Sequence, residues 1–289
     1  MRVNFLKMQG CGNDFLFVDA VRASSYSTFR PYEVQYYCDR HFGIGADGIV
    51  ILHRSQVADI GWTFYNSDGS SAEMCGNAAR CAVKYINEKY LPDETVSIET
   101  LAGVIKGRKL GDGRVEVSLL PQQNFQFNYD ETVLEIDKAA FQIYITNTGV
   151  PHAVLEVKDL VTYPIARVAK AIQSHGLFKE RGTNVTFFQR LVGNRIRSTT
   201  FERGVNAETL ACGTGAAAAA LIYSRLYAQP VPISVSVPGG ELSVGVSPVS
   251  QVLLLTGPAE YVFEVEVESA PPHFERNSVY SENRPRNHP

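Results

Sequence analysis

The chain has 289 residues, 45% hydrophobic and 20% charged, which is enough for one large or two ordinary globular domains with a full core. Its net charge is −3 and no basic block occurs, so neither nucleic acid nor an anionic membrane is an expected partner. The sequence shows no window of about 18 apolar residues and no cleavable apolar segment at its start, so we expect a cytoplasmic protein without a membrane span.

Five cysteines, an odd number, are spread along the chain: Cys11, Cys38, Cys75, Cys81 and Cys212. They form no CxxC pair, so neither a disulfide framework nor a structural zinc site is expected. We therefore expect cysteines that are buried or reactive, and no bound metal.

In the first half, a strand at Leu16–Val18 precedes a helical stretch. A short strand then leads through a polar loop to MCGNAARCAVKYI, where Cys75 directly precedes a predicted helix. Another strand, Thr95–Thr100, ends in a glycine turn. The segment PQQNFQFNYD (121–130) is the expected linker to the second half.

The second half follows the same order. A strand at Ala153–Val157 comes first, ACGTGAAAAA (211–220) predicts a buried helix directly after Cys212, and a strand follows at Ile233–Val237. Gly213 and Gly215 fall in the first turn of that helix, where glycine allows close approach to unpaired N–H groups. Residues 270–289, rich in Pro, Asn, Ser and charge, are expected to form a disordered or surface-lying tail.

The two halves share a register, because Cys75 and Cys212 lie 137 positions apart and the same offset finds further matches. These matches are Gly12 with Gly149, Gly45 with Gly182, Phe64 with Phe201, Gly76 with Gly213, Asn77 with Thr214, and VSIETLAG (96–103) with ISVSVPGG (233–240). The repeat predicts an α+β fold of two pseudo-symmetric domains, each a mixed, mostly antiparallel sheet or barrel around a central helix. The expected domains are 1–130, joined by a C-terminal strand near 260–269, and 131–262.

A thiol at a helix start lies among unpaired N–H groups that lower its pKa and can hold an anion. A single such cysteine is more often a buried structural residue. Two of them related by a repeat fit inversion of a carbon centre, in which a thiolate removes a proton from one face and a thiol protonates the other. Cys75 and Cys212 are therefore expected to face one another across an interdomain cleft.

The sequence resembles the diaminopimelate epimerase family, which epimerises an amino acid without a cofactor. The matching stretches are GCGNDF (10–15), GIGADG (43–48), YNSDGSSAEMCGNAARC (65–81), PHAV (151–154), GTNV (182–185), FERGVNAETLACGTGA (201–216) and PGG (238–240). The resemblance implies the diaminopimelate-epimerase-like fold, with Cys75 and Cys212 as the catalytic acid and base and an amino acid as the small-molecule partner. It leaves open whether the protein is a homodimer.

The resemblance also implies the substrate contacts. The α-carboxylate is expected at the two helix starts, Gly76–Asn77 and Gly213–Thr214. The residues implied for the α-amino group and the distal end of the substrate are Asn13, Asn66, Asn184, Glu202 and Arg203. His152 is implied beside the thiols, although taken alone it would more often be a core histidine. Under the 137 offset, Arg203 is the mate of Asn66.

One position departs from the family pattern. Members usually have asparagine where this chain has Val150, the mate of Asn13 under the 137 offset, so a polar contact to the distal part of the substrate is missing. Gly48 is glutamine in some members, although glycine also occurs there. The departure concerns selectivity and leaves the catalytic pair intact.

Three functions are compatible with these features. The first is conversion of LL-2,6-diaminopimelate into the meso form, for lysine and cell-wall synthesis, which Arg203, Asn66 and Asn184 favour. The second is a racemase of the same fold for another amino acid, such as glutamate or histidine, which Val150 favours. The third is an amino-acid-binding protein whose two cysteines form a redox-sensitive pair.

Overall fold

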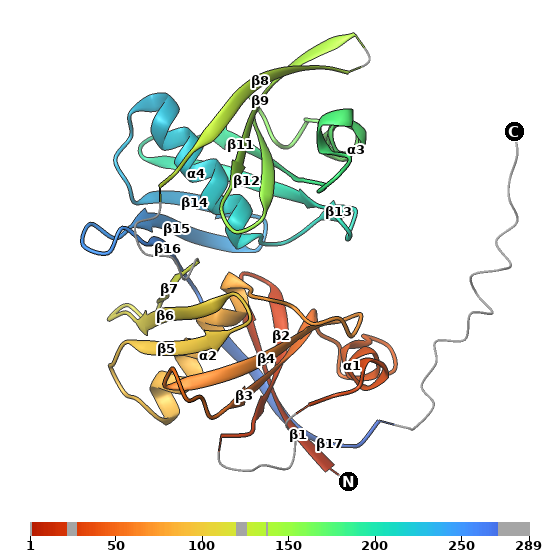
Figure 1. Cartoon of the computed structure of the whole chain (residues 1–289), viewed down its shortest axis with the longest axis vertical. Helices are drawn as coiled ribbons and strands as arrows, with labels where there is room; N and C mark the ends of the chain where they lie inside the picture. The colour runs from red at the N-terminus through yellow and green to blue at the C-terminus, as the bar shows by residue number, and fades with distance from the viewer. Residues whose placement is uncertain (1, 22–27, 120–125, 137, 271–289) are drawn as a thin grey trace, which may run out of the picture.

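Each half of the chain folds as a sheet wrapped around one helix, and the two lobes lie one above the other in Figure 1. The computed structural model describes residues 2–21, 28–119, 126–136 and 138–270. Residues 271–289 of the predicted tail and 121–125 of the predicted linker lie outside the described residues. The predicted fold class, α+β with two similar lobes, is confirmed.

The first lobe is built from β1 to β7 with α1 and α2, and the last strand, β17, joins it. The elements are β1 (Arg2–Gly10), β2 (Asn13–Asp19), α1 (Pro31–Cys38), β3 (Gly48–His53), β4 (Ile60–Asn66), α2 (Gly76–Lys89), β5 (Val96–Thr100), β6 (Gly103–Lys109), β7 (Val115–Ser118) and β17 (Glu260–Glu268). Strands β2 and β3, and β4 and β5, are parallel pairs, and a helix connects the two strands of each pair. All other pairings are antiparallel, with β17 alongside β1 in the lower lobe (Figure 1).

The second lobe repeats this plan with β8 in the place that β17 has in the first. Its elements are β8 (Tyr129–Ile136), β9 (Ala139–Asn147), β10 (Pro151–Glu156), α3 (Ile165–Ser174), the 3-10 turn η1 (Gly176–Phe178), β11 (Asn184–Arg190), β12 (Arg195–Glu202), β13 (Ala207–Glu208), α4 (Gly213–Tyr227), β14 (Ile233–Val237), β15 (Gly240–Val246) and β16 (Leu253–Gly257). Again the parallel pairs, β10 with β11 and β12 with β14, are the ones bridged by helices.

Strands β7 and β16 join the two sheets. Val117 pairs with Leu255, and Ser118 pairs with Leu254. The 137 offset maps Val117 onto Leu254 and Ser118 onto Leu255, so each of these two pairs is the counterpart of the other. The pseudo-twofold axis that relates the lobes therefore passes between the two pairs. The central helices α2 and α4 share one buried core that continues through both lobes. The five alanines from Ala216 to Ala220 are at most 1% exposed, because small side chains let α4 lie close to the surrounding strands.

The strand ladders correct part of the sequence register. Ile60 pairs with Ile98 in the first lobe, and Ile196 pairs with Val235 in the second, so β4 and β12 correspond at an offset of 136. The predicted match of Phe64 with Phe201 is therefore wrong, and the two rings belong to different clusters, Phe64 beside α2 and Phe201 beside α3. A one-residue shift reverses the facing of every side chain in a strand, which is why periodicity and structure can disagree here.

The same shift changes the partners of two site residues. Asn66 ends β4 as Glu202 ends β12, so the mate of Asn66 is Glu202 and not Arg203. Asn184, the first residue of β11, corresponds to Gly48, the first residue of β3. The offset of 137 holds from the cysteines onward, where β14 and β15 match β5 and β6 residue for residue.

In each lobe, a carboxylate at the end of a strand accepts hydrogen bonds from tyrosines near the C-terminal end of the central helix. Asp19 at the end of β2 accepts hydrogen bonds from the hydroxyls of Tyr85 (2.7 Å) and Tyr90. Glu156 at the end of β10 accepts one from Tyr227 at 2.6 Å, and Asp19 and Tyr90 map onto Glu156 and Tyr227 under the 137 offset. Within the described ranges no helix combines the length and apolarity that a membrane crossing would need.

Candidate active site

Cys75 and Cys212 are the N-cap residues of α2 and α4, and both have extended backbones with φ of −141° and −112°. The helices begin next to each other, since a Cβ added to Gly213 would lie 4.0 Å from the Cα atom of Gly76. The same added atom would lie 2.9 Å from Leu255, and one added to Gly76 would lie 2.8 Å from Leu119. Glycine at both helix starts therefore lets the two thiol-bearing turns meet.

Amide side chains surround Cys75, which is partly exposed. Its thiol lies 3.7 Å from Oδ1 of Asn13, and the same oxygen accepts a hydrogen bond from Nδ2 of Asn77 at 2.9 Å. Nδ2 of Asn77 also donates to the carbonyl of Ala211 in the other lobe (3.1 Å), directly before Cys212. Asn77 is thus a direct link between the two cysteine turns.

Asn13 reaches this position from the turn between β1 and β2. Its Nδ2 donates to Asp47 at 2.6 Å, and Asp47 also accepts from Arg40 at 3.0 Å. The turn needs backbone at positive φ, 54° at Cys11 and 80° at Gly12, and it packs against the second lobe. A side chain on Gly239 would collide with the carbonyl of Cys11, so the PGG motif is required by this contact.

Hydroxyl and backbone groups surround Cys212 instead. Its sulfur accepts a hydrogen bond from the N–H of Gly215 at 3.4 Å, and it lies 3.4 Å from Oγ1 of Thr214. Burial raises the pKa of the Cys212 thiol to about 12, and the Glu202 carboxylate adds to that rise. The negative charge of a Cys75 thiolate raises the pKa of Cys212 further, so the two sulfurs are electrostatically coupled.

Burial also raises the pKa of the Cys75 thiol, with Glu202 acting in the same direction. The backbone N–H groups of Ala78 and Asn77 and the guanidinium of Arg80 act against that rise. Both thiols thus share burial and Glu202 as reasons to stay protonated, and both have groups that act against this: the helix-start N–H groups and Arg80 at Cys75, and Thr214 with the Gly215 N–H at Cys212.

His152 lies beneath Cys212 and is connected to it through Thr214. Its Nε2 is 3.0 Å from Oγ1 of Thr214, and its Nδ1 is 2.9 Å from Oγ1 of Thr186, which in turn lies 3.0 Å from Thr200. Complete burial, with a smaller effect of Arg203, lowers the pKa of His152 to about 3. The imidazole is therefore neutral, with one nitrogen donating and the other accepting.

The remaining predicted binding residues lie at or next to strand ends. Oδ1 of Asn184 accepts from the backbone N–H of Arg203 at 3.0 Å, which fixes the start of the Arg203 loop. The exposed guanidinium of Arg203 donates to the carbonyl of Arg181, and Glu202 accepts from Thr209 at 2.7 Å. Asn66 is exposed and donates to Ser70 (3.0 Å) within its own loop, so its contacts do not connect it to the other predicted residues.

Val150 lies in the turn between β9 and β10, at the position equivalent to Asn13. The side chain of Asn147 accepts from the N–H of Gly149 at 2.9 Å and so closes this turn. Asn147 is therefore engaged in holding the turn, and Val150 leaves the second lobe without the amide that Asn13 provides in the first.

Sequence reasoning missed several groups that hold these residues. They are Arg80, Asp47, Thr148, Thr186 and Thr200. Arg80 and Asp47 stand inside the quoted motifs MCGNAARC and GIGADG, so their position was visible but not their contacts. The threonines gave no signal, because a buried hydroxyl chain has no sequence period.

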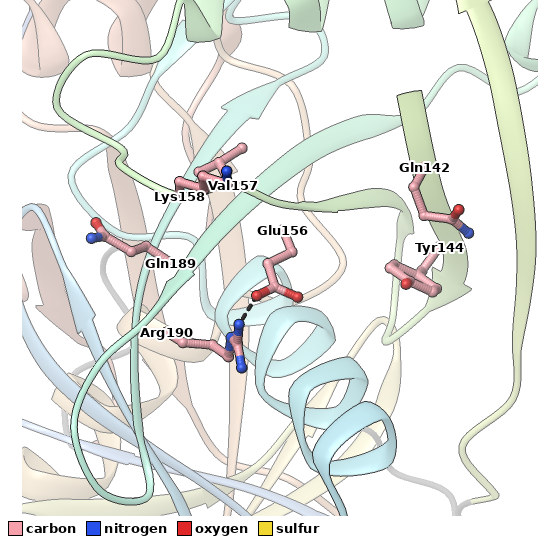
Figure 2. Close-up of a pocket in the computed structure, with 7 residues that line it drawn as sticks. All are labelled: Gln142, Tyr144, Glu156, Val157, Lys158, Gln189 and Arg190. Atoms are coloured by element: carbon pink, nitrogen blue, oxygen red, sulfur yellow. Dashed lines mark hydrogen bonds and ion pairs between the residues drawn. The ribbon is translucent and has the colours of Figure 1, made fainter. Parts of the chain in front are cut away.

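Two cavities lie away from the cysteines, near the C-terminal ends of the central helices. Figure 2 shows one of about 530 Å³, where Glu156 and Arg190 form an ion pair near Gln142 and Tyr144. A second, of about 660 Å³, is lined by Asn4, Leu6 and Asp19 among others, which occupy the equivalent places in the first lobe. Neither touches Cys75 or Cys212, so the chemistry of the thiols, not cavity size, marks the candidate site.

A family model described as diaminopimelate epimerase matches residues 5–119 and 144–262. The diaminopimelate epimerase of Aquifex aeolicus is 38% identical over 273 residues, covering 91% of this chain and 96% of that protein. That of Carboxydothermus hydrogenoformans is 39% identical over 274 residues, covering 91% and 99%.

Solved structures share the fold at lower identity. A hydroxyproline epimerase from Agrobacterium vitis superposes with a TM-score of 0.68 at 16% identity, covering 93% of this chain and 94% of that one. A PhzF-family phenazine biosynthesis protein from Bacillus anthracis gives the same TM-score and identity, covering 93% and 99%. At this identity the likeness extends to the two-lobed architecture alone.

Proposed function

The chain belongs to the diaminopimelate epimerase family, and from this we propose that it is an isomerase converting LL-2,6-diaminopimelate into meso-2,6-diaminopimelate. Within metabolism this reaction would serve lysine and cell-wall precursor synthesis. The observation that carries the proposal is the meeting of two cysteine-capped helix starts, one from each lobe.

The proposed chemistry uses the two thiols as a base and an acid. A thiolate on one side removes the α-hydrogen as a proton and becomes a thiol, while the C–H electron pair stays on the α-carbon and spreads into its carboxylate. The opposite thiol then donates its proton to the other face and becomes a thiolate. No electron is gained or lost, so the step needs no redox cofactor.

The helix starts would stabilise the charge that builds up on the carboxylate. Backbone N–H groups at Gly76–Asn77 and Gly213–Thr214 point out of the two helix N-termini, where the dipoles favour an anion. Preorganised N–H groups aimed at developing charge are commonly the largest single contribution to catalysis. With Asn13 fixed by Asp47 and Asn77, the α-amino group would have a preoriented amide beside Cys75.

Selectivity for a second carboxylate would come from Arg203. Its guanidinium is exposed, and Asn184 holds the backbone from which it projects. An arginine can grip a carboxylate with two parallel hydrogen bonds. Asn66 and Glu202 are proposed to complete the distal end, while Val150 supplies no polar contact there.

The deciding experiment is solvent deuterium incorporation at the α-carbon with LL-diaminopimelate, L-glutamate and L-histidine side by side, under reducing conditions and without added pyridoxal phosphate. Deuterium with inversion of diaminopimelate is expected. Faster turnover of glutamate or histidine would identify a racemase of the same fold instead. Binding without exchange would leave the amino-acid-binding alternative. The homodimer and the cytoplasmic location stay predictions.

A further inference from the structure

Asn13 is one member of a row of hydrogen bonds that begins at a guanidinium and ends at a carboxylate. Arg80 donates to Oδ1 of Asn77 at 2.9 Å, and Nδ2 of Asn77 donates to Oδ1 of Asn13, also at 2.9 Å. Nδ2 of Asn13 then donates to Oδ2 of Asp47 at 2.6 Å. The row leads from the core to the surface, because Arg80 and Asn77 are buried and Asp47 is exposed.

The two ends of this row determine how the amides between them are turned. A guanidinium can only donate and an ionised carboxylate can only accept, whereas an amide side chain does both. If the Asn13 amide were turned over, its oxygen would face the Asp47 carboxylate and its NH₂ would face the donating NH₂ of Asn77, so both bonds would be lost. Asn13 therefore has one favourable orientation, in which Oδ1 lies 3.7 Å from the Cys75 sulfur.

Asp47 is held in place although it is exposed. Its Oδ1 accepts a hydrogen bond from Arg40 at 3.0 Å, and its Oδ2 also accepts from the backbone N–H of Asp14 at 3.2 Å. Arg40 binds the buried Asp14 carboxylate through two further hydrogen bonds of 2.7 and 3.1 Å, and Lys7 forms an ion pair with that carboxylate at 2.8 Å. The acceptor at the end of the row is thus anchored to the sheet by charged groups.

The second lobe has different residues at all four positions of the row. The replacements are Val150 for Asn13, Thr183 for Asp47, Thr214 for Asn77 and Ala217 for Arg80. Thr183 is the counterpart of Asp47 because each directly precedes the first residue of its strand, β11 or β3. The Thr183 hydroxyl donates to the carbonyl of Asn184 at 2.9 Å. The four positions differ together, which is expected if the four side chains act as a unit in the first lobe alone.

We propose that Asp47 is a positioning residue that turns the Asn13 amide so that Oδ1, and not Nδ2, faces the ammonium group of the substrate beside Cys75. An ammonium group can only donate hydrogen bonds, so an amide turned the other way would present its own N–H groups to a positive charge. The inference rests on the function proposed above, to which it adds the group that sets the orientation of Asn13.

The first test is a double-mutant cycle in kcat/KM for diaminopimelate. Asp47→Ala removes the acceptor, so kcat/KM should fall on the order of ten- to a hundredfold. The loss should lie mainly in KM, because the ammonium contact is made both before and during the reaction. Asp47→Asn has nearly the same shape but can also donate, so its loss should be intermediate. In an Asn13→Ala background, Asp47→Ala should cause less than about a twofold further loss, since both residues act through one contact. Losses that multiply would overturn the proposal, because Asp47 would then support only its loop.

Asp59→Ala is the matched control. Asp59 is another exposed carboxylate of the first lobe and accepts from the N–H of Ser97 at 2.7 Å. It directly precedes β4, whose opposite end carries Asn66. The substitution therefore removes a carboxylate of the same kind away from Asn13, and kcat/KM should stay within about twofold of wild type. A loss equal to that of Asp47→Ala would overturn the proposal.

NMR spectra of the isotope-labelled, substrate-free protein test the orientation without turnover. The side-chain NH₂ resonances of Asn13 are assigned by their absence from Asn13→Ala. The hydrogen donated to Asp47 should resonate downfield in the wild type and in Asp59→Ala, and should move upfield in Asp47→Ala. An Asn13 amide that does not respond to Asp47→Ala would overturn the proposal. A wild type with the expected amide resonance but no deuterium exchange at the α-carbon would instead refute the proposed function, so the two failures are distinguishable.

Discussion

The two lobes place the same atom, a cysteine sulfur before a helix, in two different chemical environments. Around Cys75 the neighbours are the amides of Asn13 and Asn77, while Cys212 lies beside the Thr214 hydroxyl, which the neutral His152 imidazole contacts; the Glu202 carboxylate acts on both thiols. The backbone frame is shared strand by strand. An inversion requires two groups of opposite role on opposite faces, so a symmetric frame is useful here only because its side chains differ.

The largest expected effect comes from removing either sulfur. Cys75→Ala and Cys212→Ala should each lower epimerisation by a factor on the order of 10²–10⁴, since each removes one partner of the proton transfer. One-sided α-hydrogen exchange without inversion should survive at a low rate in each variant, from opposite faces. A steady-state assay with deuterium readout measures both. Retention of a tenth of wild-type turnover in either variant would rule out the two-thiol mechanism.

Arg203 has no cationic counterpart in the first lobe, so its removal should affect substrate choice rather than chemistry. Arg203→Ala should weaken transition-state binding of diaminopimelate by about 1.5–3 kcal/mol, the range for a hydrogen bond to a charged group. Substrates with one carboxylate fewer at the distal end should lose far less. The comparison is kcat/KM for diaminopimelate and histidine in both proteins, and equal losses would exclude Arg203 from the distal site.

His152 occupies the position in the second lobe that Phe15 occupies in the first. Since phenylalanine cannot bind a proton, low pH should destabilise only the second lobe through this position. The folded pKa of His152 is about 3, below that of an unfolded histidine near 6.5, so protons bind preferentially to the unfolded chain between these values. Stability is complete above about pH 6.5 and should fall by up to about 1.4 kcal/mol per pH unit below it. Urea unfolding at a series of pH values gives the free energy of unfolding of wild type and His152→Gln. Between about pH 6.5 and about pH 3 this free energy should fall less steeply with decreasing pH in the variant. Parallel slopes would contradict a neutral buried imidazole.

Gly215 and Ala78 are equivalent positions with different requirements. A Cβ on Gly215 would lie 2.2 Å from Oγ1 of Thr200 and 3.0 Å from that of Thr186, whereas Ala78 is already accommodated. Gly215→Ala should cost about 1–3 kcal/mol through overpacking. Ala78→Gly should cost only about 0.5–1 kcal/mol, the usual price of glycine in a helix. Denaturant titration measures the free energy of unfolding of both variants. A stabilising Gly215→Ala would show that the side chains of Thr186 and Thr200 can move to make room for the added methyl group.

The smallest effect is expected from restoring symmetry at Val150. Val150→Asn adds a side-chain amide at the position equivalent to Asn13, worth about 0.5–1.5 kcal/mol if it reaches the substrate. The KM for diaminopimelate should fall several-fold while kcat stays the same. An unchanged KM would mean that the turn held by Asn147 keeps this position away from the substrate.

Sequence alone was sufficient for the two-lobed α+β fold and for the helices after both cysteines, because cysteine, glycine and alanine recur at a fixed spacing. It failed in β4 and β12, where similar residues at Phe64 and Phe201 suggested a register that the ladders contradict. Periodicity cannot detect a one-residue shift when both faces of a strand are buried. The contacts of Arg80 and of the hydroxyls of Thr186, Thr200 and Thr214 could not be predicted either. They join segments that are distant in sequence, and they depend on side-chain geometry.

The pairing of β1 with β17 has a consequence for the order in which the protein forms during synthesis. Strands β8 to β16 come from a continuous stretch of chain, so the second lobe has its own ladder once residue 257 has been added. The first lobe is synthesised earlier, but its strand β1 cannot pair with β17 until Val267, the partner of Val3, has been synthesised. Such distant pairing closes slowly, because a long loop must be ordered before the contact forms. The lobe translated first is therefore the one completed last, and the edge of β1 stays open to other chains until the ribosome has made nearly all of this one.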